Sequence, residues 1–185
     1  EFLPDGLLLR FLEYLTIDES CDLSCCSKQI RKTVDMFKGY ECCSIISDID
    51  SKNLQTVADA LRNNTTLSKL SLLKNRIGAK GLLAITSALT VSGTNHNRTL
   101  TTLALEGNTL GPMGADLIAE ALKDNKTLIN LFLMSNEISD AGAKDIAEAL
   151  KVNTTLHILY LRENQIGGAG AKSIAEALKV NKSLT

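Results

Sequence analysis

The chain has 185 residues, of which 44% are hydrophobic and only 4% aromatic, and its formal net charge at pH 7 is −1. Proteins whose main partner is nucleic acid usually carry a basic patch, so this balance argues against that class. No apolar run approaches the roughly 18 residues of a membrane span, and no basic-then-apolar leader begins the chain, although a mature chain would have lost one. We therefore expect no nucleic-acid partner, no membrane segment and no secretion.

Short helices are expected in the first forty residues. Asp5 is well placed as an N-cap, because Leu7, Leu8, Phe11, Leu12 and Leu15 follow it at helical spacing. After a polar break at 16–20, an apolar stripe resumes and continues to Phe37. The pattern does not repeat, and it predicts a small helical domain or cap over residues 1–38.

This segment resembles an F-box, the motif that docks a protein onto the Skp1 subunit of cullin-based ubiquitin ligases. The matching residues are Leu3-Pro4, Leu7–Leu9, Phe11-Leu12-x-Tyr14-Leu15 and Leu23-Ser24-x-Cys26-Ser27-Lys28. Two positions depart from the usual pattern, Ser20 and Ile30. The resemblance implies that Skp1 contacts Leu3, Pro4, Leu8, Leu9 and Leu12. A plain cap over the neighbouring domain would show the same apolar spacing, and the sequence leaves both readings open.

All five cysteines lie in the first quarter of the chain, at positions 21, 25, 26, 42 and 43. Adjacent cysteines and an odd total fit a disulfide framework poorly. Zinc sites usually use Cys-x-x-Cys pairs, and the sequence contains none. We expect buried, reduced thiols and no metal site.

From residue 67 onward the chain repeats one phrase, Leu-x-x-Leu-x-Leu-x-x-Asn-x-Ile/Leu, followed by glycines and a helical tail. Leu100, Leu128, Leu156 and Leu184 open successive copies at a period of 28 residues, and another copy begins at Leu67. Residues 39–66 form a degenerate first repeat, with its strand expected near 41–46. Five inserted residues within 91–99 predict a protruding loop. The copy at 184–185 stops at once, so we expect a fragment of a longer array.

Each copy predicts one strand and one helix. Leu131 and Leu133 point inward and Phe132 outward, because strand side chains alternate. Residues 143–150 form a helix with one apolar stripe, and glycines allow a tight passage into it. The recurring asparagines have amides that can satisfy turn groups, so stacked copies should form a buried ladder of Asn75, Asn108, Asn136 and Asn164.

This form resembles the ribonuclease-inhibitor type of leucine-rich repeat, over about residues 51–185. The resemblance extends to the Ran GTPase activator and to the sensor regions of NOD-like receptors. The period and pattern predict an α/β solenoid with parallel strands on the concave face and helices on the convex face. The repeat domain covers 39–185, with repeats starting at 67, 100, 128 and 156. A solenoid is a binding scaffold far more often than a catalyst.

No catalytic group can be assembled from the sequence. His96 and His157 have no Cys or Ser partner at a fixed spacing. The glycine-rich stretch 166–170 looks like a phosphate loop, yet the same slot recurs as repeat geometry. Glycosylation sequons at Asn63, Asn64, Asn97, Asn125, Asn153 and Asn181 also mostly recur with the repeat. We expect no enzyme activity, no cofactor and no metal.

The side chains expected on the concave face are the remaining candidates for a binding site. Its outward side chains form two rows across the stack: Ser71, Ala104, Phe132 and Tyr160, then Leu73, Glu106, Met134 and Arg162. Strands lie about 4.8 Å apart, so four of these residues should form one patch: Phe132, Met134, Tyr160 and Arg162. Such residue types are enriched at interface hot spots. We expect a protein partner to contact Leu73, Glu106, Phe132, Met134, Tyr160 and Arg162.

Together these patterns predict an interaction scaffold, with a substrate adaptor of a cullin-type ubiquitin ligase as the leading hypothesis. Its N-terminal helices would hold Skp1, and it would be cytoplasmic or nuclear. The alternative is a ligand-recognition solenoid of a receptor or GTPase-activator type, with a helical cap and no ligase role. Because extracellular leucine-rich repeats often have a cysteine-rich N-terminal cap, a secreted protein is the minority reading.

Overall fold

The computed structural model describes residues 42–44, 51–90 and 96–185. The predicted helical domain at 1–38, with its F-box-like Leu3, Pro4, Leu8, Leu9 and Leu12, lies outside these residues. The cysteines at 21, 25 and 26 and most of the insertion at 91–99 lie outside them too.

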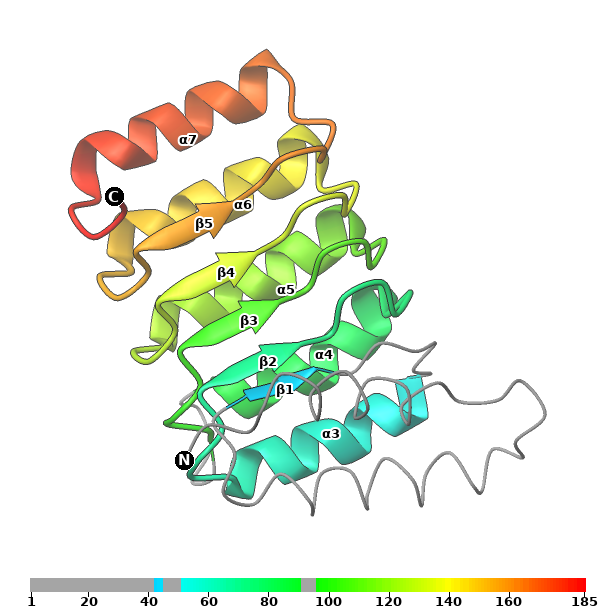
Figure 1. Cartoon of the computed structure of the whole chain (residues 1–185). Coiled ribbons are helices and arrows are strands. Elements are labelled where there is room, and N and C mark those ends of the chain that lie inside the picture. The colour runs from blue at the N-terminus through cyan, green and yellow to red at the C-terminus, as the bar shows by residue number, and fades with distance from the viewer. Residues whose placement is uncertain (1–41, 45–50, 91–95) are drawn as a thin grey trace, which may run out of the picture.

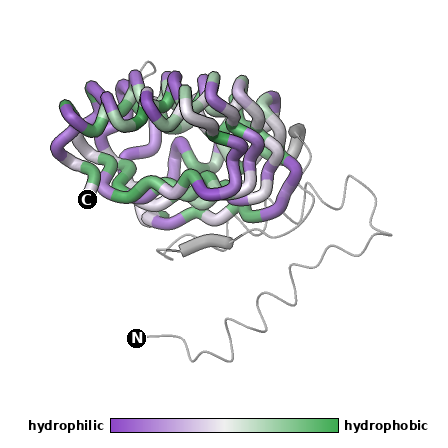
Figure 2. Tube along the Cα trace, turned by 90° about the horizontal axis from the view of Figure 1, so that it is seen from above, coloured by the Kyte–Doolittle hydropathy of each residue, from purple (hydrophilic) through white to green (hydrophobic). Residues whose placement is uncertain are grey.

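Strands and helices alternate along the described chain (Figure 1). The elements are β1 (Cys42–Ser44), α3 (Ser51–Asn63), β2 (Lys69–Ser71), α4 (Gly78–Leu89), β3 (Thr102–Ala104), α5 (Gly111–Asp124), β4 (Asn130–Phe132), α6 (Ser139–Val152), β5 (Ile158–Tyr160) and α7 (Gly168–Val180). The strands form one parallel sheet in sequential order, β1-β2-β3-β4-β5. The helices form a second layer opposite the sheet, and seen along the stack the units superpose (Figure 2). The predicted α/β solenoid is confirmed.

Register follows the repeat. Leu70 pairs with Leu103, Leu103 with Leu131, and Leu131 with Leu159. The five extra residues within 91–99 leave this alignment unchanged, because they come between α4 and β3 in the sequence. The strand expected near 41–46 is found at Cys42–Ser44, where Cys43 pairs with Leu70.

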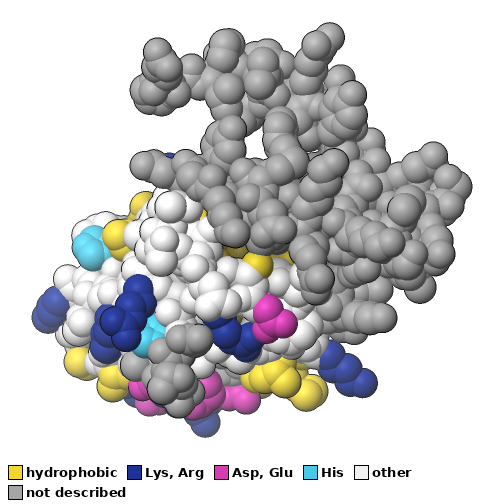
Figure 3. Space-filling model, turned by 90° about the horizontal axis from the view of Figure 1, so that it is seen from below, with side chains coloured by type: hydrophobic (Ala, Val, Ile, Leu, Met, Phe, Trp, Pro, Cys, Tyr) yellow, Lys and Arg dark blue, Asp and Glu magenta, His cyan; other side chains and the backbone are white. Residues whose placement is uncertain are grey.

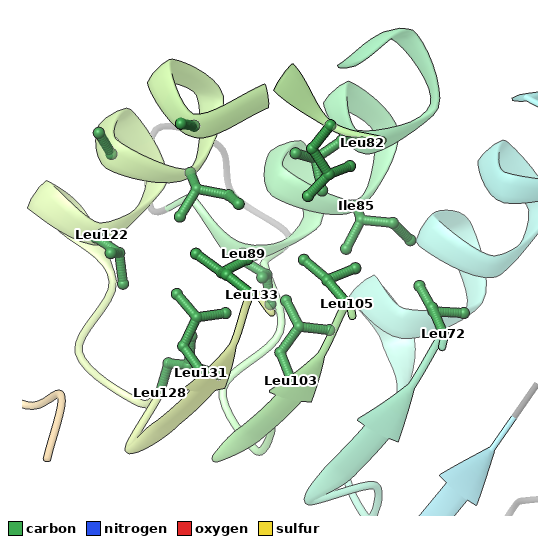
Figure 4. Close-up of a cluster of buried hydrophobic side chains, with 14 of the residues drawn as sticks. Leu72, Leu82, Ile85, Leu89, Leu103, Leu105, Leu122, Leu128, Leu131 and Leu133 are labelled. Carbon is green, nitrogen blue, oxygen red and sulfur yellow. The ribbon is translucent and has the colours of Figure 1, made fainter. Parts of the chain in front are cut away.

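The core lies between the two layers. Leucines of the strands meet apolar side chains of the helices, as Figure 4 shows for Leu103, Leu105 and Ile85. In α6 the predicted stripe is fully buried: Ala143, Ile146, Ala147 and Leu150 are each 0% exposed. Burying a leucine or isoleucine side chain stabilises a fold by about 1.5–3 kcal/mol.

The repeated glycines serve two purposes, and only one was expected. Gly78 and Gly111 have positive φ, 60° and 63°, which suits the tight passage into a helix. Ser139 fills the same slot of the next unit at φ 61°, so glycine is not obligatory there. Gly142 instead allows close packing, because an added Cβ would lie 2.5 Å from the Cβ of Ala115 and 2.7 Å from Cγ2 of Ile138.

An asparagine ladder runs beneath the strand ends. Asn75, Asn108, Asn136 and Asn164 are at most 2% exposed. The backbone N–H of Asn108 donates to Oδ1 of Asn136 (2.9 Å), and that of Asn136 donates to Oδ1 of Asn164 (2.8 Å). The amides of Asn108, Asn136 and Asn164 also donate to carbonyls of the preceding unit; that of Asn136 reaches the Leu105 carbonyl at 2.8 Å. The side chains therefore join consecutive units.

A second asparagine ladder runs along the helix C-termini, where the sequence suggested only helix ends. Its members Asn97, Asn125, Asn153 and Asn181 are at most 9% exposed. Nδ2 of Asn153 donates to the carbonyls of Leu122 (2.7 Å) and Asn125 (3.3 Å) in the preceding unit. Its Oδ1 accepts from the N–H groups of Thr155 (3.0 Å) and Leu156 (2.8 Å). Both edges of the solenoid are thus held by buried amides.

Helix α7 packs against α6 on one side, and its other side is exposed. Ala175 is exposed and Leu178 is 48% exposed, whereas the equivalent Ala147 and Leu150 of α6 are 0% exposed. Regions with few buried apolar contacts open most readily, so we expect α7 amides to exchange about ten- to a hundredfold faster than α6 amides. Native-state hydrogen exchange of the 185-residue chain measures this. Equal protection in the two helices would contradict it.

Candidate protein-interaction surface

The outward side chains of β2 to β5 form the surface that corresponds to the predicted concave face, called here the sheet face. The first row is set by strand pairing, which aligns Ser71, Ala104, Phe132 and Tyr160. The second row lies two residues further on. Backbone pairing continues there, because the N–H of Lys74 donates to the Glu106 carbonyl and that of Gly107 to the Met134 carbonyl. The sheet face is therefore a regular two-row array.

An aromatic pair occupies the C-terminal half of this array. The rings of Phe132 and Tyr160 are stacked, with centroids 5.2 Å apart and planes inclined by 27°. Phe132 is half-buried and Tyr160 is 50% exposed. Stacked aromatics present a large rigid surface at low cost in side-chain entropy, which suits a binding site.

Polar contacts hold the residues beside the pair. Nε of Arg162 lies 3.1 Å from Oε1 of Glu163, and Oγ of Ser135 donates to Oε2 of Glu163 at 2.8 Å. The Arg162 side chain is 75% exposed, so its ion pair is weak and leaves it accessible to a partner. Met134, which precedes Arg162 in the second row, is half-buried. The structure thus places Phe132, Met134, Tyr160 and Arg162 on neighbouring strands.

The N-terminal half of the sheet face is different. Leu73 and Glu106 are both half-buried in the second row. Oε2 of Glu106 is buried and accepts no hydrogen bond from any residue that the structure describes. A carboxylate oxygen withdrawn from water without a donor is destabilising, and sequence reasoning did not identify this feature.

The helical face carries ordinary surface ion pairs. Lys123 lies 2.5 Å from Glu120, and Lys151 lies 2.6 Å from Glu148. The hydrogen bond with Glu120 raises the pKa of Lys123, and the hydrogen bond from Lys151 lowers the pKa of Glu148. Figure 3 shows acidic and basic side chains together on the part of the surface seen there. These groups are exposed and paired with one another, so they do not form a reactive site.

The described residues offer little for chemistry. They contain no group of three or more His, Cys, Asp or Glu side chains that could hold a metal ion. Nδ1 of His157 bonds to the Thr155 carbonyl at 2.8 Å, within the loop. A cavity of about 10 Å³ lies in the core beside Leu89, Ile118 and Leu131. It holds at most about one water molecule, so it suits no substrate.

Two properties of the described part bear on its surroundings. None of the helices there is both long and apolar enough to cross a membrane. The sequon asparagines Asn97, Asn125, Asn153 and Asn181 have their amides bonded to backbone carbonyls in the folded state. These four amides are therefore not accessible for glycosylation in the folded chain.

Comparison with known families and structures agrees with this geometry. Residues 63–85, 96–119, 124–147 and 152–175 match the Leucine Rich repeat family, and residues 2–42 match the F-box domain family. A search of curated proteins found no match. Among solved structures, Leiomodin-1 Actin-Binding Site 2 is similar at a TM-score of 0.67 and 24% identity, covering 83% of this chain and 87% of that one.

The tropomodulin C-terminal domain of Caenorhabditis elegans is also similar, at a TM-score of 0.57 and 17% identity, with 87% of this chain and 93% of that chain covered. At these identities the two structures support the fold alone.

Proposed function

The chain belongs to the leucine-rich repeat family, and from this premise we propose that it is a substrate adaptor of a cullin-type ubiquitin ligase. In this proposal residues 1–38 hold Skp1, and the sheet face holds a protein that is to be ubiquitylated. The observation that carries it is domain order. The F-box match ends at residue 42, where the first strand of the solenoid begins. Leucine-rich repeats and F-box domains are both interaction modules.

The solenoid supplies what such an adaptor needs, a stiff surface at a defined place. Two buried asparagine ladders and a continuous parallel sheet join each unit to the next. The stacked Phe132–Tyr160 pair, with Met134 and Arg162 beside it, is a surface of the type that forms interface hot spots. We therefore place the partner on Leu73, Glu106, Phe132, Met134, Tyr160 and Arg162.

This function assigns the chain to the cytoplasm or nucleus and gives it no catalytic step of its own. The adaptor brings the substrate close, and the other ligase subunits perform the transfer. Sequon asparagines whose amides bond to backbone carbonyls agree with such a compartment, and so would the reduced cysteines that the sequence predicts. We keep residues 1–38 and 39–185 as the two proposed domains.

Skp1 binding tests the proposal directly. We expect the purified 185-residue chain to bind purified Skp1 at micromolar concentrations or tighter. Leu9→Asp should abolish this binding with little change in stability, because it places a charge on an apolar surface that the ligase subunit grips. Leu83→Asp is the matched control, since Leu83 is 55% exposed on α4 in the repeat domain, and its binding should be unchanged.

Absence of binding by the intact chain at micromolar Skp1 would sink the adaptor proposal. If the Leu9→Asp variant binds Skp1 as tightly as the unmodified chain, Skp1 contacts residues other than the predicted ones. In the first case the N-terminal helices are a cap, with Leu8, Phe11, Leu12 and Leu15 packed inward. The recognition solenoid without a ligase role would then replace the adaptor.

A further inference from the structure

Glu106 has one carboxylate oxygen without a hydrogen-bond donor on the sheet face. It lies in the second row between Leu73 and Met134, and its Oε2 atom is buried with no hydrogen-bond donor among the described residues. The other glutamate of the sheet face, Glu163, has two partners: Ser135 donates to one of its oxygens and Arg162 pairs with the other. Glu106 is therefore the carboxylate that a bound partner has most to gain by contacting.

The basic side chains near Glu106 do not satisfy it. Lys74 bonds to Glu106 only through backbone atoms, its own N–H and the Glu106 carbonyl. Arg162, two strands away in the same row, forms an ion pair with Glu163. A carboxylate that lacks a donor gains most from a cationic one, because charge-assisted hydrogen bonds are the stronger kind.

The surroundings of Glu106 suit a long basic side chain. Ala104 precedes Glu106 by two residues on the same strand and leaves a small residue in the first row. Strand pairing sets Phe132 directly beside Ala104, and the stacked ring of Tyr160 follows. A Lys or Arg stem can lie over Ala104 and against the aromatic pair, where ring faces attract a cation.

We propose that the protein partner inserts a lysine or arginine side chain, flanked by apolar residues, into this place, with the cationic group at Glu106 and its stem against Phe132. This inference rests on the proposed function, because it requires the sheet face to be the binding surface. It narrows the partner to proteins that present a basic residue in an exposed apolar segment.

The test uses two small peptides and the full 185-residue chain. The probes are acetyl-Leu-Arg-Leu-amide and its citrulline counterpart, which keeps the shape of arginine and removes the charge. Binding is followed by NMR through the resonances of Glu106, Phe132 and Tyr160. The variants are Glu106→Gln and the control Glu137→Gln, since Glu137 is an exposed glutamate of the strand-to-helix loop.

We expect the arginine peptide to bind the unmodified chain about tenfold more tightly than the citrulline peptide, because only the former offers a cation. Glu106→Gln should reduce this ratio to about twofold or less, while Glu137→Gln leaves it near tenfold. The same spectra show whether each variant is folded. Equal binding of the two peptides, no binding of either, or an unchanged ratio in Glu106→Gln would overturn the proposal.

Measuring Skp1 binding with the same preparation shows whether a negative result contradicts the Glu106 site or the proposed adaptor function. A chain that binds Skp1 but does not distinguish the peptides keeps the adaptor function and loses the Glu106 site. A chain that distinguishes them but does not bind Skp1 keeps the site and loses the adaptor function.

Discussion

We expect Asn153→Ala to lower the free energy of unfolding by about 2–4 kcal/mol, since several buried groups lose their partners and each is worth about 1–3 kcal/mol. Asn153 is 1% exposed. Its amide serves two carbonyls of the preceding unit, and its carbonyl oxygen serves two N–H groups of its own loop. Alanine can replace none of these bonds, and three of the four are buried.

Urea unfolding of the purified chain measures the effect as a shift of the midpoint. Asn63→Ala is the matched control, because Asn63 is exposed and its amide donates to the Asp59 carbonyl at 3.1 Å within the same helix. The control should change the free energy by about 0.5 kcal/mol or less. If Asn153→Ala behaves like the control, the second ladder does not hold the units together.

The first ladder should be nearly as sensitive. We expect Asn136→Ala to lower the free energy of unfolding by about 1–3 kcal/mol, because the Asn108 N–H loses its buried acceptor and the Leu105 carbonyl loses one of its two amide donors. Asn136 is 0% exposed and lies in the middle of the stack. Loss of its side chain therefore weakens the contacts of this unit with the preceding one, whereas the bond from its backbone N–H to Asn164 remains.

The control for this variant is Asn130→Ala in the same repeat. Asn130 is half-buried on the sheet face, and its Nδ2 donates to Oγ1 of Thr102 at 2.9 Å. One partly exposed bond is readily replaced by water, so the control should cost about 1 kcal/mol or less. An unchanged thermal midpoint for Asn136→Ala would show that the ladder bonds do not stabilise the fold.

The rows of the sheet face could be read from the repeat. Residues 28 apart from residue 100 onward occupy equivalent positions, and the structure pairs Phe132 with Tyr160 and Leu131 with Leu159 accordingly. Strand alternation then decides which side chain faces the core. These features are local and periodic, so one sequence was enough to predict them.

Other features depended on packing between units. The second ladder could not be predicted from the sequence, because Asn153-Thr154-Thr155 is equally compatible with a helix end, a sequon or a buried bridge between units. Only the distance to the Leu122 carbonyl in the preceding unit distinguishes these readings. Gly142 likewise resembles a turn glycine in the sequence, whereas the structure places Ala115 and Ile138 where its Cβ would lie.

The sequence by itself determined the architecture, a stack of strand–helix units in fixed register, because an apolar pattern with one period closes only against copies of itself. It also determined which residues share the sheet face. Tertiary structure alone decided what each of them contacts: the ring stack of Phe132 on Tyr160, the two partners of Glu163, and the unsatisfied Oε2 of Glu106. Those outcomes depend on side-chain directions and on atoms about 28 residues away, which a periodic pattern of residue types does not encode.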